Sequence, residues 1–168
     1  MPKTDVAYQR CINPACGATY AIDSSEVRHI EMLEHVTVVP NANPAIDGVV
    51  FSRGQVIPAL NLRARFGFAR VEHDLRTRLV FVQVQNRVVG LIVDSAREFL
   101  PISTDQIRPI EHTLTGIHGN YLKAVANPGE RLILLLDLDA VLDVDEYEPA
   151  QPGAPEPSSN RQLATLTP

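Results

Sequence analysis

Short apolar runs separated by glycine, proline and polar residues recur along the chain and predict β-strands. The clearest segment is 48–62, GVVFSRGQVIPALNL, in which two apolar runs flank the polar break Ser52-Arg53-Gly54. This pattern predicts a hairpin or tight corner between two buried strands, Val49–Phe51 and Val56–Leu62. Gly54 suits the turn because it adopts a positive φ without a Cβ clash. Arg53 is either a solvated turn residue or a guanidinium held at the edge of an apolar surface for a partner carboxylate.

Four further segments predict strands. Val36–Val39 is rich in β-branched residues and stops at Pro40. Leu79–Gln85 and Val88–Val93 predict a second hairpin, with a tight turn at Asn86-Arg87. Leu132–Leu138 is continuously aliphatic, which is typical of a strand buried on both faces.

Helical signals are few and short. Asp23-Ser24-Ser25 followed by Glu26 predicts one capped turn, and Ser103–Gln106 predicts another that ends before Pro109. Leu138–Leu142 is a third candidate. Many short strands with few helices predict a mainly β protein built as barrels or as a sandwich.

Composition narrows the class of protein. The 168 residues suit one domain, or two small subdomains that share a core. The chain is 45% hydrophobic but only 5% aromatic and has no tryptophan, so the core must be aliphatic. A net charge of −5 argues against non-specific binding to nucleic acid or to an anionic membrane.

The sequence predicts neither a secretory signal nor a membrane-spanning segment. Met1–Arg10 lacks the apolar centre of a secretory signal, and the longest aliphatic run, Leu132–Leu136, is too short to span a bilayer. We therefore expect a cytoplasmic protein without direct membrane insertion. Residues 148–168 hold five of the thirteen prolines and predict a disordered, Pro-rich tail.

No constellation of catalytic residues emerges. The sequence lacks a dinucleotide-binding glycine motif, a P-loop and a nucleophile elbow, and the glycine pair in Gly116–Gly119 is too weak to predict a phosphate site. The acidic stretch Asp137–Glu146 fails the calcium-loop pattern, because Val141 and Leu142 stand where a ligand and a glycine are needed. We expect no enzyme activity and no cofactor.

Cys11 and Cys16 leave one alternative open. Their C-x4-C spacing offers two metal ligands that His29 or His35 would complete, although structural zinc sites usually pair ligands more closely. Two ordinary thiols are the favoured interpretation, and a disulfide is not expected in a cytosolic protein. A metal or redox sensor remains the alternative hypothesis.

Five groups of residues, taken in order and spacing, resemble the CheW family of bacterial chemosensory coupling proteins. The resemblance runs from Tyr20 to about Leu142. It rests on Tyr20-Ala21-Ile22-Asp23 with Val27 and Ile30; Pro40-Asn41 and Pro44 leading to Gly48-Val49; Arg53-Gly54 with Val56, Pro58 and Leu62; Arg87-Val88-Val89-Gly90 followed by Val93-Asp94; and Gln106-Ile107-Arg108-Pro109.

The resemblance implies a fold and a role. It implies two interleaved, five-stranded SH3-like barrels within a CheW-like domain at residues 8–147, with a groove between them. It implies a non-catalytic adaptor between the cytoplasmic tip of chemoreceptors and the regulatory domain of the histidine kinase CheA, with other CheW-like domains as further partners. The receptor tip is a helical hairpin, so docking would lay a helix in an apolar groove.

The resemblance also implies two sets of interface residues. Val27, His29, Ile30 and Arg53 match the receptor-facing positions of the family. Gly48, Val56 and Phe99 match kinase-facing positions. These matches favour the second interpretation of Arg53, as an anchor at the mouth of the groove.

Three departures from the family pattern concern partner choice. Position 29 is commonly acidic in the family and is His29 here, with Glu31 as a compensating carboxylate. Phe51 stands where the family usually has asparagine, and Cys11–Gly17 interrupts the first strand, since Pro14 cannot donate to a ladder. A chemosensory system for pilus motility is therefore an alternative to a flagellar one.

Overall fold

Two β-sheets form the molecule. The computed structural model describes the backbone of residues 5–13, 18–110 and 121–143, and the side chains of 19–96, 99–110 and 121–143. The five-stranded sheet has the order β3-β6-β7-β5-β4, and the six-stranded sheet the order β8-β1-β2-β11-β10-β9. The strands are β1 (Asp5–Asn13), β2 (Ala18–Asp23), β3 (Val27–Met32), β4 (Ile46–Ser52), β5 (Gln55–Asn61), β6 (Arg78–Val84), β7 (Arg87–Val93), β8 (Ser95–Ser103), β9 (Ile107–Pro109), β10 (Leu122–Ala126) and β11 (Ile133–Leu136).

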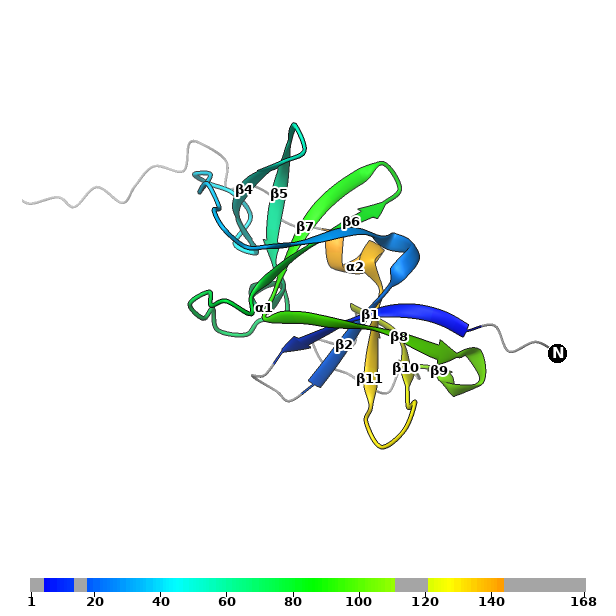
Figure 1. Ribbon diagram of the computed structural model, residues 1–168. Coiled ribbons are helices and arrows are strands. Elements are labelled where there is room, and N and C mark those ends of the chain that lie inside the picture. Colours follow the sequence, from blue (N-terminus) through cyan, green and yellow to red (C-terminus); the bar gives the residue numbers. More distant parts are fainter. Residues whose placement is uncertain (1–4, 14–17, 111–120, 144–168) are drawn as a thin grey trace, which may run out of the picture.

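The chain visits the two sheets in an interleaved order. It begins in the six-stranded sheet with β1 and β2, builds the whole five-stranded sheet from β3 to β7, and returns for β8 to β11. Figure 1 shows the two groups of strands one above the other, with the β4–β5 hairpin projecting from the upper group. The predicted mainly β fold with two barrel-like subdomains is confirmed, although one of its sheets has six strands because the short β9 joins its edge.

Three hydrophobic clusters explain why the apolar runs are continuous. One cluster is drawn only from the six-stranded sheet, one only from the five-stranded sheet, and the third from both. Leu79 and Phe81 of β6 point into the five-stranded cluster, whereas Val80 and Val82 point into the shared one. Successive side chains of a strand face opposite sides, so a strand between two cores needs apolar residues at every position. Ile133–Leu136 alternates between two clusters in the same way.

The predicted short helices form, and one more appears. Asp23 caps the 3-10 turn η1 (Ser24–Glu26), η2 (Thr104–Gln106) follows Ser103, and Asp137 caps α2 (Leu138–Leu142). The unpredicted helix is α1 (Leu62–Arg65), whose first turn is capped by the Asn61 side chain. Leu62 was predicted to end a strand and instead starts this helix.

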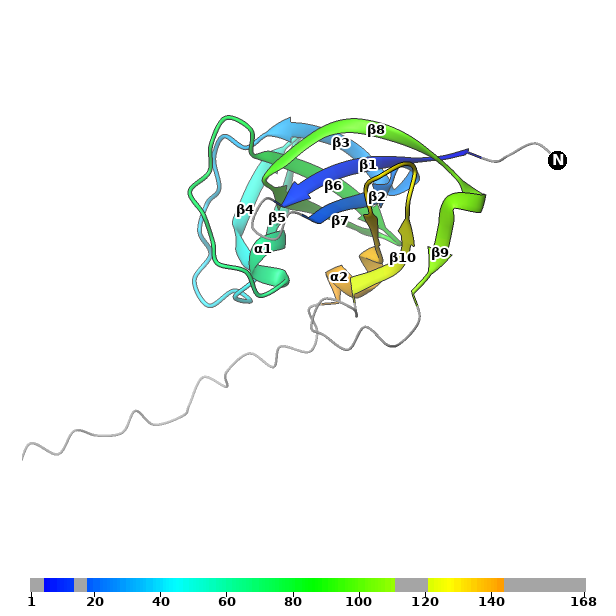
Figure 2. The same cartoon turned by 90° about the horizontal axis from the view of Figure 1, so that it is seen from below.

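The helices α1 and α2 are tied to each other. Figure 2 shows both on the same side of the sheets. Arg65 of α1 donates from Nε to the carbonyl of Val141 at 2.8 Å and from a terminal nitrogen to that of Asp143 at 2.5 Å. Its guanidinium also lies 4.8 Å from the ring centre of Tyr121. One arginine thus satisfies the carbonyls at the end of α2, which its own helix leaves without partners.

Several predicted boundaries are wrong. Val36–Val39 forms no strand; only Thr37 pairs, in a single bridge with Val49. The β6–β7 turn lies at Gln85-Asn86, one residue earlier than predicted, with Gln85 at a φ of 55°. The interruption predicted at Cys11–Gly17 does not begin at Cys11, since β1 pairs with β2 as far as Asn13 and has a bulge at Arg10/Cys11; its remaining residues, 14–17, lie outside the described residues.

Some predictions fall outside the described residues. These include the tail at 148–168, Cys16 with the rest of 14–17, and the glycine pair within 111–120. Among the described residues, no helix is long and apolar enough to cross a membrane. Within the same residues, no three His, Cys, Asp or Glu side chains converge as metal ligands.

Candidate protein-binding surface

The tip of the β4–β5 hairpin presents an exposed apolar pair beside a cation. Arg53 and Gly54 form its two-residue turn with φ of 48° and 79°, the positive values of a type I′ turn. Phe51 and Val56 lie directly opposite each other and are 76% and 67% exposed. The predicted hairpin is confirmed. The residues at its tip are exposed, however, and the two strands are buried only further from the turn.

Arg53 has no hydrogen-bond or ion-pair partner among the described residues. Arg53 also adopts a left-handed backbone conformation, which is energetically unfavourable for a residue that has a Cβ. The turn therefore presents an uncompensated guanidinium next to two exposed apolar side chains. Such a combination is suited to a partner that offers a carboxylate within an apolar surface.

The strand β3 places the other predicted receptor-facing residues on two faces. A bulge between Val27 and His29 changes the alternation. Val27 and Ile30 are half-buried against the cluster shared by both sheets. His29 faces the five-stranded cluster and stacks on Phe81, with ring centres 4.3 Å apart and planes 18° from parallel.

Glu31 connects β3 to the base of the hairpin turn. The Ser52 hydroxyl donates to Glu31 Oε1 at 2.9 Å, and His29 Nε2 lies 3.0 Å from the same oxygen. The Glu31 side chain is 40% exposed, so a partner can reach it. Through Glu31, His29 is thus connected to Ser52, the residue before Arg53, whereas Val27 and Ile30 lie on the opposite face of β3.

Gly48 is buried and functions through its lack of a side chain. It follows a bulge in β4 and lies under residue 37, with which Val49 exchanges two backbone hydrogen bonds of 2.8 and 2.9 Å. A Cβ on Gly48 would lie 2.1 Å from the carbonyl oxygen of Thr37. Only glycine permits this close approach.

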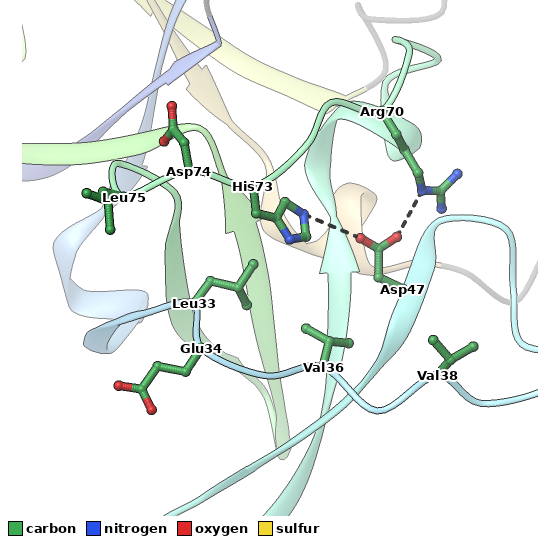
Figure 3. Close-up of a pocket in the computed structure, with 9 residues that line it drawn as sticks. All are labelled: Leu33, Glu34, Val36, Val38, Asp47, Arg70, His73, Asp74 and Leu75. Atoms are coloured by element: carbon green, nitrogen blue, oxygen red, sulfur yellow. Dashed lines mark hydrogen bonds and ion pairs between the residues drawn. The ribbon is translucent and has the colours of Figure 1, made fainter.

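A hollow of about 770 Å³, here called the Asp47 hollow, opens beside Gly48. Figure 3 shows its two sides, the connection from β3 to β4 and the loop before β6. It is lined by Leu33, Glu34, Val36, Val38, Asp47, Arg70, His73, Asp74 and Leu75.

Asp47 organises one wall of the Asp47 hollow. Its carboxylate accepts hydrogen bonds from Asn61 Nδ2 at 2.8 Å and from Arg70 Nε at 3.0 Å, and His73 Nε2 lies 4.0 Å away (Figure 3). Arg70 also donates to the carbonyl of Pro44. These contacts hold the loop against β4 and the preceding segment.

The third predicted kinase-facing residue lies on the other sheet. Phe99 is in β8 and is 62% exposed. Gly48 and Val56 belong to β4 and β5 of the five-stranded sheet. The three residues therefore do not form one patch, and a partner that contacted all of them would span both sheets.

Sequence analysis missed two elements of this surface. The Asp47 hollow joins residues of three separate segments, and none of them carries a motif. The largely buried ion pair between Arg63 and Asp94 was also missed. Oδ2 of Asp94 lies 2.8 Å from an Arg63 terminal nitrogen, with side-chain exposures of 18% and 11%. Their 31-residue separation leaves no local signal.

Glu26 of η1 gives the fold a pH dependence. Its Oε2 is shielded from solvent and has no hydrogen-bond partner among the described residues. Burial raises the pKa of Glu26 above its ordinary value; Lys123 opposes this shift, and Asp23, Asp137 and Asp139 add to it. A raised pKa means that the folded state favours the protonated acid.

We expect Glu26→Gln to increase stability at pH 7. The wild-type side chain stabilises the fold below its unfolded pKa and loses that contribution as the pH rises through the folded pKa. The neutral amide avoids this loss, so the variant should have the higher melting temperature at pH 7 and no advantage near pH 4. Thermal melts at both pH values would measure the difference. Glu130→Gln, at an exposed loop position, is the control; an equal gain at both pH values would contradict the assignment.

Comparison with known proteins identifies the family. The model of the CheW-like domain matches residues 14–146, most of the chain. The chain belongs to the CheW family. The chemotaxis protein CheW of Klebsiella aerogenes is 32% identical over 127 residues, which cover 76% of each chain. The CheW proteins of Rhizobium meliloti and Bacillus subtilis are 30% and 29% identical, covering 78% and 81% of this chain and 84% and 87% of those proteins.

A solved structure supports the CheW fold. The scaffolding protein TtCheW from Thermoanaerobacter tengcongensis superposes with a TM-score of 0.78 at 23% identity. The match covers 86% of this chain and 97% of that one. The predicted family resemblance is confirmed, while the interface residues assigned through it remain predictions.

Proposed function

We propose that this CheW-family chain is a non-catalytic adaptor that couples the cytoplasmic tips of chemoreceptors to the regulatory domain of the histidine kinase CheA. The relatives are named chemotaxis proteins, and the structural neighbour is described as a scaffolding protein. An adaptor of this kind acts in the cytoplasm at membrane-associated receptor arrays.

The hairpin tip is the observation that carries this proposal. Arg53 and the pair Phe51 and Val56 combine an uncompensated cation with exposed apolar area. Surfaces with an arginine beside aromatic and aliphatic anchors are typical of protein–protein interfaces. A cluster of large exposed apolar side chains also favours binding to a partner, because binding removes this apolar surface from water.

The receptor tip is proposed to dock beside Arg53 and β3. The carboxylate of Glu31 is held by the hydroxyl of Ser52, and Ser52 directly precedes Arg53 in the hairpin. This arrangement presents an acid and a base together. A helical partner with complementary charges would be oriented by both, which supports specificity more than raw affinity.

We expect Arg53→Glu to weaken binding of the receptor tip by about tenfold or more, which corresponds to about 1.4 kcal/mol. The reason is that a carboxylate on the receptor would face a like charge in place of its partner. Arg53 is exposed and has no partner among the described residues, so the variant should fold as wild type. Titration of a receptor-tip fragment against both proteins would measure the loss.

Arg131→Glu is the matched control, because it makes the same charge change at an exposed loop position before β11. It should bind the receptor tip with wild-type affinity. If Arg53→Glu folds and binds as tightly as this control, Arg53 does not contact the receptor.

A further inference from the structure

Side chains join the two edges of the five-stranded sheet. The edge strands are β3 and β4, which pair with β6 and β5 and, in the part of the chain that the structure describes, not with each other. The Ser52 hydroxyl at the end of β4 nevertheless donates to Glu31 of β3 at 2.9 Å. This junction is here called the β3–β4 seam. Because no ladder spans the seam, its closure depends on the side chains that meet across it.

Oε1 of Glu31 is the shared neighbour of two polar groups that have little access to water. Ser52 is 5% exposed. His29 Nε2 is shielded from solvent and lies 3.0 Å from the same oxygen without forming a hydrogen bond. The stacking of His29 on Phe81 holds this nitrogen beside the carboxylate. Without Glu31 the Ser52 hydroxyl would be buried with no acceptor, so closure of the seam would be less favourable.

A hollow of about 400 Å³ lies at the seam. Its apolar lining comes from β3 and the residue after it, from β4 and from β6: Met32, Leu33, Val50, Phe51 and Leu79. Val50 and Leu79 belong to the hydrophobic cluster of the five-stranded sheet, and Leu33 packs against that cluster. Val50 is 6% exposed, whereas the next residue, Phe51, is 76% exposed. The boundary between this cluster and solvent therefore runs through the seam.

We infer that Glu31 is a latch that holds the β3–β4 seam closed. When the hydrogen bond from Ser52 breaks, the end of β4 separates from β3 and exposes Val50, while the rest of the sheet stays folded. The opening is local because β6, β7 and β5 each have a paired strand on both sides. Arg53 directly follows Ser52, so the latch also fixes where the hairpin tip presents its guanidinium.

Thiol labelling of two buried positions measures the opening. Val50→Cys reports on the seam, and Ile92→Cys, at a position 4% exposed in the same cluster but on the central strand β7, is the matched control. Iodoacetamide labelling followed by peptide mass spectrometry distinguishes both from the native Cys11 and Cys16. Val50→Cys should react at least about tenfold faster than Ile92→Cys. Its rate should rise only weakly with urea, because local opening exposes little surface, whereas the rate of Ile92→Cys should rise steeply.

Removing the latch should increase the opening. In the Val50→Cys protein, Glu31→Ala should raise the labelling rate by about tenfold and leave its urea dependence weak. Glu31→Gln keeps an oxygen that can accept from Ser52, so it should raise the rate by less than about threefold. Glu34→Ala removes an exposed carboxylate that lines the same hollow and accepts no hydrogen bond from Ser52, and it should leave the rate unchanged. Circular dichroism confirms that each variant is folded.

Two results would overturn the inference. Equal rates at Val50→Cys and Ile92→Cys, with the same steep urea dependence, would show that the cluster is exposed only by global unfolding. An unchanged rate at Val50→Cys after Glu31→Ala, or an equal increase after Glu34→Ala, would show that the Glu31 contact does not hold the seam. The labelling needs no partner protein, so either result would leave the proposed function untouched.

Discussion

Replacing Gly48 with alanine is expected to lower the free energy of unfolding by about 3 kcal/mol. The new Cβ would lie 2.1 Å from the carbonyl oxygen and 2.7 Å from the carbonyl carbon of Thr37. Both are backbone atoms, so no rotamer change relieves the overlap. Gly48 also has a φ of 155°, which residues with side chains rarely adopt.

The expected structural response is a displacement of residues 36–38 from β4. That movement breaks the two hydrogen bonds between Thr37 and Val49. For a chain of 168 residues, the loss corresponds to a melting temperature lower by about 6–12 °C. Calorimetry and urea unfolding would measure it, and amide exchange of Val49 would report the broken bridge.

Gly67→Ala is the control that separates overlap from backbone strain. Gly67 has a φ of 79°, but a Cβ there would meet no atom within 4 Å. Its replacement should cost about 1–2 kcal/mol through the left-handed conformation alone. Equal losses of unfolding free energy for the two variants would show that the overlap with Thr37 does not destabilise the protein.

The apolar runs predicted the strands well where both faces of a strand are buried. Two such segments, Leu79–Val82 and Ile133–Leu136, each lie between two hydrophobic clusters. Every position in them is therefore apolar, whereas an amphipathic helix or a loop would contain polar positions. Val36–Val39 has the same β-branched character but failed as a strand. Val38 is 76% exposed, and beyond the Thr37 bridge no strand pairs with this segment. Propensity describes a fit to neighbours that only the fold supplies.

The candidate site was predictable only where it is local. The hairpin around Arg53 was visible because turn and strands are contiguous in the sequence. The hydrogen bond from Ser52 to Glu31 joins residues 21 apart, and the walls of the Asp47 hollow are further apart still. Contacts of this kind depend on how β3 and β4 meet at the edges of the five-stranded sheet, which no periodicity encodes.

The Arg63–Asp94 pair is the second place where a single change should have a large effect. Asp94 stands between β7 and β8, where the chain crosses from the five-stranded to the six-stranded sheet. Arg63 Nε lies 2.8 and 3.0 Å from the two carboxylate oxygens, and a terminal nitrogen lies 2.8 Å from one of them. A carboxylate held at both oxygens fixes the direction of the crossover relative to α1.

We expect Asp94→Ala to lower the free energy of unfolding by about 3 kcal/mol. The loss arises because the Arg63 side chain, 11% exposed, would keep its charge and lose the carboxylate. Arg63→Lys should give a smaller loss, since an ammonium keeps the charge but cannot reproduce the forked contact. In a double-mutant cycle, Arg63→Ala combined with Asp94→Ala should cost less than the sum of the single changes.

Arg76→Ala provides the comparison, because it removes an ion pair of the same 2.8 Å separation that is largely exposed, at 68% and 50%. Water and salt screen such a pair, so its removal should leave stability nearly unchanged. Urea unfolding of the wild type, the single variants and the double variant would measure all of these differences. Two results would contradict this expectation: additive losses of unfolding free energy for Arg63→Ala and Asp94→Ala, or a loss for Asp94→Ala no larger than for Arg76→Ala. Either would mean that burial does not make the Arg63–Asp94 pair more stabilising than an exposed pair. The stabilisation would then have to come from the clusters that the two sheets share.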